Sequence, residues 1–129
     1  MLHTGKITAL NFEYHCDAGH SPDLTFFCAF ALARASDECY YVPHMRTKVH
    51  CYMTNTATRT AVRGPGEIQA TVGIETVLEH VAAALGLSGM VVRERNLYPA
   101  DQPDLLADLK GAPFTKYTLP EEALPYCEI

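Results

Sequence analysis

Residues 54–75, TNTATRTAVRGPGEIQATVGIE, carry the strongest structural signal in the sequence. A polar run leads into Arg-Gly-Pro-Gly at residues 63–66, and a helical pattern follows it. Apolar residues then recur at the spacing of one helix face, at Ile68, Val72, Leu78, Val81, Ala82 and Leu85. Glu67 near the start and Gly86 just past the end are typical of helix boundaries. The pattern predicts a helix over about residues 67–85.

The turn at Arg63, Gly64, Pro65 and Gly66 is a candidate anion site. Free backbone N–H groups at a helix start and a guanidinium group would converge there, which suits a phosphate or another oxyanion. The glycine spacing matches neither the dinucleotide-binding fingerprint nor the P-loop. The alternative is a tight turn into the helix with no ligand, and chemistry alone leaves both interpretations open.

Two further segments have the character of strands. Residues 6–15 alternate in polarity, with one largely apolar face. Residues 40–52 read as extended, and Pro43 divides them into two expected strand pieces. Short helices are expected at residues 24–36, which are apolar and rich in alanine, and at residues 91–96.

These elements predict an α+β fold. We expect an antiparallel sheet, formed by residues 6–16 and 40–53, packed against one long helix at about residues 67–85. The short additional helices are expected at its margins, with Ser88 as the N-cap of the last one.

Length and charge exclude several classes of function. A chain of 129 residues with 48% hydrophobic residues suits one domain with a real core. The net charge is −5 and there is no basic block, which argues against a nucleic-acid or anionic-membrane partner. The apolar run at residues 24–33 is too short to cross a bilayer. Residues 1–5 lack the features of a signal peptide, so we expect a cytoplasmic protein.

The cysteines are predicted to be reduced and to have no metal. Their odd number, without an export signal, argues against a disulfide framework. No C-x2-C pair exists, and the spacings of zinc and iron–sulfur ligands are missing. Buried cysteine acting as a small hydrophobic residue is the better account. The five are Cys16, Cys28, Cys39, Cys51 and Cys127.

A combined pattern along residues 3–98 resembles a known family. Its centre is TN at residues 54–55 followed by TAVRG at residues 60–64, and it continues through Gly66 and Gln69. The flanking matches are TGKI at 4–7, DAG at 17–19, CYYVP at 39–43, LGL at 85–87 and VRERNLY at 92–98. The pattern is similar to the molybdopterin-binding large subunit or domain of the molybdenum hydroxylases, the xanthine dehydrogenase and aldehyde oxidase enzymes.

The resemblance implies roles for four residues. Arg63 takes the position that reaches the molybdenum cofactor, whose pterin carries a phosphate. Ala61 takes a position beside the substrate. Gly64 and Gly66 would let the backbone approach the cofactor closely. Thr60 and Gln69 match the motif as well and are expected to be structural supports.

Two departures bear on the substrate. Pro65 stands where xanthine- and aldehyde-oxidising members have a phenylalanine that stacks on an aromatic substrate. Ala31 stands where purine-oxidising members have an arginine, with Arg34 one turn away. Losing the aromatic contact would forfeit about 0.5–1.5 kcal/mol, and losing a charge-assisted hydrogen bond about 1.5–3 kcal/mol. Xanthine is therefore disfavoured as the substrate of a parent enzyme.

The resemblance implies hydroxylation of a carbon centre with oxygen derived from water, and electron transfer through two Fe–S clusters to FAD. The family's general-base glutamate lies in a later part of its chain. Glu75 and Glu79 lie within the helix after the motif and are not assigned that role. No residue of this chain is therefore expected to be catalytic or a metal ligand. The implied partners are the remainder of the subunit or separate Fe–S and FAD subunits.

Three interpretations follow for the chain itself. It is a fragment of a molybdenum-hydroxylase large subunit, inactive alone, as a start that opens almost directly into a strand suggests. Alternatively, it is a small subunit that completes a split molybdenum enzyme, or a non-catalytic anion-binding remnant. We expect residues 1–111 to be a partial molybdopterin-binding domain and residues 112–129, with three prolines, an irregular arm. Self-association is expected through Phe26, Phe27 and Phe30.

Overall fold

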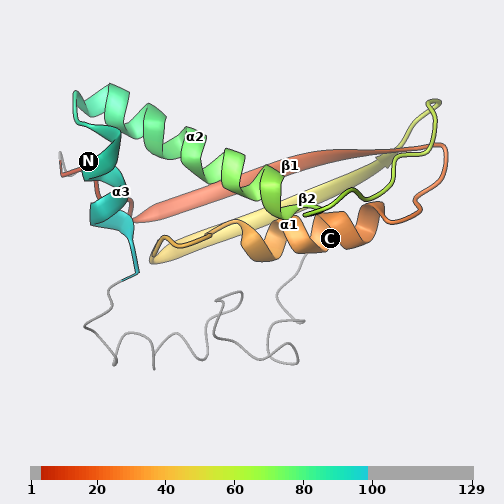
Figure 1. The fold of residues 1–129 in the computed structure, drawn as a ribbon, viewed down its shortest axis with the longest axis horizontal. Helices are drawn as coiled ribbons and strands as arrows, with labels where there is room; N and C mark the ends of the chain where they lie inside the picture. Colours follow the sequence, from red (N-terminus) through yellow and green to blue (C-terminus); the bar gives the residue numbers. More distant parts are fainter. Residues whose placement is uncertain (1–3, 99–129) are drawn as a thin grey trace.

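The computed structural model describes residues 4–98 (Figure 1). The elements in chain order are β1 (Ala9–Gly19), α1 (Thr25–Ala35), β2 (His44–Met53), α2 (Glu67–Leu85) and α3 (Gly89–Asn96). Our expectation of an irregular arm at residues 112–129 lies outside the described residues, as does the end of the expected domain at residue 111.

The two strands are parallel, so the expected antiparallel sheet is wrong. β1 and β2 pair directly, with Ala9 opposite His44 and Cys16 opposite Cys51. The 20–43 connection contains α1, and a parallel pair needs a crossover of this kind, because a tight hairpin can join only antiparallel strands. The first half of the described chain is therefore a βαβ unit.

The second expected strand is also shorter than predicted. β2 begins at His44, after Pro43, and the residues before it do not join the sheet as a strand. Tyr40 instead forms an isolated antiparallel bridge with Leu97, beyond the end of α3. This segment pairs with the far end of the described chain because the backbone of Tyr41 donates to the carbonyl of Asn96 at 2.7 Å.

One face of the sheet is covered and the other is exposed. Alternate residues of β1 are exposed from Ala9 to Asp17, and those between them are partly buried. The covered face carries two apolar clusters, one with residues of α2 and α3 and one with residues of α1 and α2. The first includes Ile7, Tyr40, Val42, Ile74, Leu78, Ala82 and Val92. The second includes Ala29, Leu32, Val49 and Ala70. Figure 1 shows α2 crossing the strand pair obliquely, with α3 turning back at the end where α2 finishes.

The buried stripe of α2 is offset from the predicted one. Ala70, Ile74, Leu78 and Ala82 are buried, whereas Ile68 and Val72 are 57% and 61% exposed. The first turn rests on α1 through Gly66, and this contact turns Ala70 rather than Ile68 toward the sheet. The helix ends at Gly86, whose φ of 64° and amide bonds to the carbonyls of Ala82 and Ala83 form a left-handed cap.

Asn96 at the end of α3 fastens the start of the described chain. Its side chain is 1% exposed. The backbone N–H of Ile7 donates to its Oδ1 at 2.8 Å, and its Nδ2 donates to the carbonyl of Gly5 at 2.8 Å. Ser88 occupies the N-cap position of α3, as expected, but makes no side-chain capping bond.

Within residues 4–98, no single helix combines the length and the hydropathy that a bilayer crossing requires. α2 and α3 pass that test only when taken together, across a bend of 120°.

Candidate functional site

Asp17 anchors the loop that carries residues 54–66 from β2 to α2. The hydroxyl of Thr54 donates to its Oδ1 at 2.6 Å, and the backbone N–H of Gly19 donates to the same oxygen at 2.9 Å. A guanidinium nitrogen of Arg59 lies 3.4 Å from Oδ2. The Thr54 bond, followed by the Gly19 bond, holds the pKa of Asp17 below its usual value. Asp17 is therefore ionised at neutral pH and ties this loop to the end of β1.

Gly66 sets the contact between α2 and α1. Its φ is 80°, and it is the buried N-cap residue of α2. A Cβ added there would lie 2.5 Å from the backbone nitrogen of Leu32 and would overlap the carbonyl oxygen of Cys28. Only glycine fits both the backbone angle and this space. Gly66 thus has a packing role, and its approach to a cofactor stays a prediction.

A hollow of about 160 Å³ opens beside this contact. The loop and the first turns of α2 contribute one side, the end of β1 contributes Cys16 and Asp17, and α1 contributes the rest. The residues from the loop and from α2 are Arg59, Thr60, Val62, Pro65, Gly66 and Gln69. The hollow therefore lies where the family motif runs into the helix.

The structure brings three of the predicted site residues together. Pro65 and Gly66 line the hollow, and the carbonyl carbon of Ala31 lies 3.1 Å from where a Cβ of Gly66 would be. Thr60 and Gln69, which were expected to be structural supports, also line it. The two positions that the resemblance links to substrate choice thus both lie near the α1–α2 contact, Ala31 on α1 and Pro65 next to Gly66.

Ala61, Arg63 and Gly64 lie on the same loop but do not line the hollow. Arg63 is exposed, and its side chain makes no hydrogen bond or ion pair with any described residue. Gly64 has a φ of 67°, and an added Cβ would lie 3.2 Å from the side chain of Ile68. Their contacts with a cofactor or substrate stay predictions.

The side chains around the loop carry both signs of charge, and Asp17 pairs with Arg59, which leaves Arg63 as the cation available to an anion. Arg59 and Arg63 are both exposed and precede the first turn of α2. No side chain caps that turn, so its N–H groups are available to a ligand. Glu67 is the one acidic residue of the first turn, and it too is exposed.

Sequence reasoning missed Arg59, Asp17 and the two cysteines of the hollow, Cys16 and Cys28. Asp17 was noted only as part of the DAG match at residues 17–19. Its pairing with the loop depends on β1 and β2 running parallel, because this places the end of β1 beside the end of β2. No local signal in the sequence indicates that arrangement.

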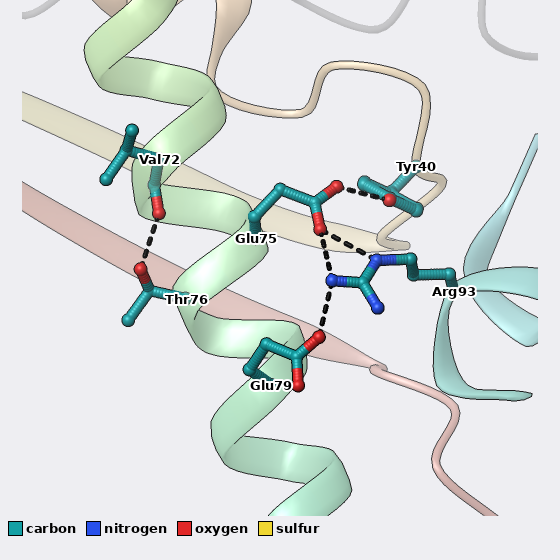
Figure 2. Close-up of polar contacts among 6 residues, drawn as sticks. All are labelled: Tyr40, Val72, Glu75, Thr76, Glu79 and Arg93. Atoms are coloured by element: carbon teal, nitrogen blue, oxygen red, sulfur yellow. Dashed lines mark hydrogen bonds and ion pairs between the residues drawn. The ribbon is translucent and has the colours of Figure 1, made fainter. Parts of the chain in front are cut away.

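Glu75 and Glu79 belong to a separate interhelical network (Figure 2). The hydroxyl of Tyr40 donates to Glu75 Oε1 at 2.5 Å, and Arg93 Nε donates to Glu75 Oε2 at 2.8 Å. Arg93 also donates to Glu79 at 2.5 Å. Burial raises the pKa of Glu75, but the bonds from Tyr40 and Arg93 outweigh it and leave the pKa below its usual value. These carboxylates clamp α2 to α3 and do not line the hollow.

The hollow fits one wall of a cofactor site and not a whole one. Sites that bury most of a cofactor-sized ligand are roughly 300–1,000 Å³, larger than the 160 Å³ found here. Within residues 4–98, no group of three or more His, Cys, Asp or Glu side chains is arranged to hold a metal ion. The donors present, exposed guanidinium and backbone N–H groups, match the chemistry of a phosphate.

Comparison with known proteins identifies the family. Residues 2–97 match the family described as the molybdopterin cofactor-binding domain. An indole-3-acetaldehyde oxidase of Arabidopsis thaliana is 34% identical over 116 residues, covering 90% of this chain and 8% of that protein. Aldehyde oxidase 4 of Rattus norvegicus is 33% identical over 97 residues, covering 75% of this chain and 7% of that protein. A xanthine dehydrogenase/oxidase of Felis catus is 32% identical over 97 residues, with coverages of 75% and 7%.

The chain therefore spans less than a tenth of the length of these relatives. The match to the family covers each of the described elements. The match also confirms the family resemblance that the motif at residues 54–69 carries. The chain belongs to the molybdopterin cofactor-binding domain family of the molybdenum hydroxylases.

Proposed function

We propose that this chain supplies one wall of the molybdopterin site in an oxidoreductase of the aldehyde oxidase and xanthine dehydrogenase type. The observation that carries the proposal is the placement of the motif. Its residues lie on a loop that is anchored by Asp17 and borders an open hollow at the start of α2.

In this proposal the residues of the wall bind the cofactor and orient it. Arg63 would donate to the phosphate of the cofactor, because its guanidinium is exposed and makes no bond with the described residues. The first-turn N–H groups of α2 add donors in the same region. When bound, the cofactor supplies the molybdenum at which a carbon centre is hydroxylated with oxygen from water. No residue of this chain is assigned a proton-transfer role.

The substrate side of the proposal rests on Ala31 and Pro65. Neither can stack on a purine or form a charge-assisted bond with one, and both lie at the α1–α2 contact. We infer that the parent enzyme prefers a substrate other than xanthine, and that Ala61 lies beside it.

The remaining walls must come from other residues. A hollow of this size leaves most of a large cofactor exposed, so retention requires the remainder of a large subunit or separate Fe–S and FAD subunits. We therefore propose that the chain is inactive alone. We place the assembled enzyme in the cytoplasm.

Metal analysis of protein purified from its own host tests the proposal. Plasma mass spectrometry should find molybdenum close to one atom per chain only where other subunits copurify. In that assembly, Arg63→Ala should lower the molybdenum content several-fold. Lys6→Ala, which removes an exposed positive charge at the other end of the sheet, should leave it unchanged.

Two results would contradict the proposal. Full molybdenum content in an assembled Arg63→Ala enzyme would remove Arg63 from the site. Stoichiometric molybdenum on the isolated chain would show that no further walls are needed.

A further inference from the structure

Two cysteines face each other across the strand pair. Cys16 of β1 is the direct register partner of Cys51 of β2. Both are partly buried on the covered face and pack against the same apolar cluster, that of Ala29, Leu32, Val49 and Ala70. Each thiol is close enough to the other to influence its pKa. The two thiols are therefore neighbours in space as well as in register.

The strand geometry suits a covalent link. Neighbouring strands lie about 4.7–4.9 Å apart, and the Cα atoms of disulfides lie about 4.4–6.8 Å apart. The register shift in this pair comes only after Asp17, so the ladder is regular at Cys16 and Cys51. The Cβ atoms of a disulfide lie about 3.5–4.5 Å apart, so joining the two sulfur atoms requires rotation of both side chains and a small local approach of the strands.

One thiol of the pair, that of Cys16, can be reached from the hollow. Cys16 lines the open hollow together with Cys28 of α1, so a small thiol reagent entering there meets a sulfur atom. The described residues form no group of three or more His, Cys, Asp or Glu side chains that could hold a metal ion.

We propose that Cys16 and Cys51 are a redox-sensitive pair that closes into a disulfide when a low-molecular-weight disulfide, such as oxidised glutathione, is present. One cysteine thiolate attacks a sulfur of oxidised glutathione, forms a mixed disulfide and releases one glutathione thiolate. The second cysteine then attacks the protein-bound sulfur, forms the Cys16–Cys51 bond and releases the second glutathione. Two protein thiols are oxidised, and one glutathione disulfide is reduced to two thiols.

The surroundings set the rate of this exchange. Burial is the main reason that the pKa of each thiol is raised, so little thiolate is present at neutral pH and the reaction accelerates as the pH rises. Cys28 is near enough to interact electrostatically with both thiols. It lies on a helix, however, and has no register partner, so the strand pair is the preferred link.

A link at this position would act on the candidate site. Cys16 precedes Asp17, the anchor of the loop, and Cys51 lies two residues before the end of β2. The disulfide would therefore fix the ends of the strands from which the loop of residues 54–66 departs. This consequence does not depend on the cofactor and applies to the chain as it stands.

The test equilibrates the full 129-residue chain in glutathione buffers of graded redox ratio. Free thiols are then blocked with iodoacetamide, and non-reduced peptides are identified by mass spectrometry. We expect a Cys16–Cys51 cross-link, the loss of two alkylatable thiols per chain and a higher thermal unfolding midpoint. Cys39→Ser removes an exposed thiol elsewhere and should leave the cross-link intact. Cys127→Ser serves as a control for links between chains.

Cys16→Ser and Cys51→Ser should each abolish the loss of two thiols. Two outcomes would overturn the proposal. One is a wild-type chain that keeps both thiols alkylatable in the most oxidising buffer. The other is a link from Cys16 to Cys28 in place of Cys51. Circular dichroism of the reduced variants shows whether they fold, and the peptide map of the wild type decides the matter without them.

Discussion

At the scale of single residues, two glycines with left-handed backbone angles provide a matched comparison. Gly66 has a φ of 80° and packs on the backbone of α1, whereas Gly86 has a φ of 64° and nothing within 4 Å of an added Cβ. Gly86→Ala should lower the unfolding free energy by about 1–2 kcal/mol through backbone strain alone. Gly66→Ala should cost at least about 3 kcal/mol, because α1 must also move.

Urea denaturation followed by circular dichroism measures both variants. Equal losses of unfolding free energy would show that the α1 contact at Gly66 adds nothing to the backbone strain.

Asn96 is the second residue whose side chain decides a local structure. Asn96→Ala would leave the buried N–H of Ile7 and the carbonyl of Gly5 without their partner. We expect a loss of about 3 kcal/mol in unfolding free energy. Glu94→Ala, at an exposed position on the same helix, should change it by less than about 0.5 kcal/mol. Thermal unfolding of the two variants tests this prediction, and similar unfolding midpoints for both would contradict it.

These residues also show what the sequence can and cannot indicate at this scale. The glycines around Arg63 are recognisable because they belong to a motif. Asn96 lies inside a motif too, but its role depends on a partner 89 positions earlier in the chain. A hydrogen bond across that separation has no local pattern, and it becomes visible only when the fold brings the two ends together.

At the scale of elements, the helix at residues 67–85 was predicted from its pattern, and α2 occupies those residues. The relative direction of the strands was not. β1 alternates between exposed and partly buried residues, a pattern that is typical of antiparallel sheets with one solvated face. The same alternation arises here because the outer face of a parallel pair is open. The length of the helical connection was the better signal.

The contact between α2 and α3 predicts that the stability of the fold depends on pH. The folded-state pKa of Glu75 lies below its usual value of 4.5, so the unfolded chain takes up the proton first. Its stabilising contribution is therefore present above about pH 4.5 and is lost as the pH falls through the folded-state pKa. Because the side chain of Glu75 is about one-third exposed, we expect its contribution to the unfolding free energy to be only about 1 kcal/mol.

Unfolding free energies measured by urea titration from about pH 3 to pH 7 test this dependence. Glu75→Gln should flatten the acid side of the curve, and Glu94→Gln should not. Asp17, whose pKa is also lowered, should contribute in the same direction. A Glu75→Gln curve parallel to that of the wild type would show that the clamp is not linked to protonation.

At the scale of the whole molecule, the structure exposes several large apolar side chains on and before α1. Leu24, Phe26 and Phe27 are 48%, 53% and 57% exposed, and Phe30 is partly buried. An apolar surface of this kind favours association. We predict that the isolated chain self-associates through Phe26 and Phe27, with a sedimentation coefficient that rises with concentration.

A Phe26→Ser, Phe27→Ser double variant should sediment as a monomer. Met90→Ser, at an equally exposed position on α3, should behave as the wild type. A clean monomer peak for the wild type in gel filtration at high concentration would count against the prediction.

The fastening of Gly5 and Ile7 by Asn96 also has a consequence for biosynthesis. Because the ribosome synthesises the chain from the N-terminus onward, the residues before β1 leave the ribosome long before Asn96, whose side chain holds them. The backbone hydrogen bonds of Tyr41 with Asn96 and of Cys39 with Tyr98 likewise form only after that end of the chain has been made. A nascent chain halted before α3 is complete therefore has both strands but lacks these closing bonds. Ile7, Tyr40 and Val42, which pack together in the finished core, would stay open to chaperones until translation has passed that point.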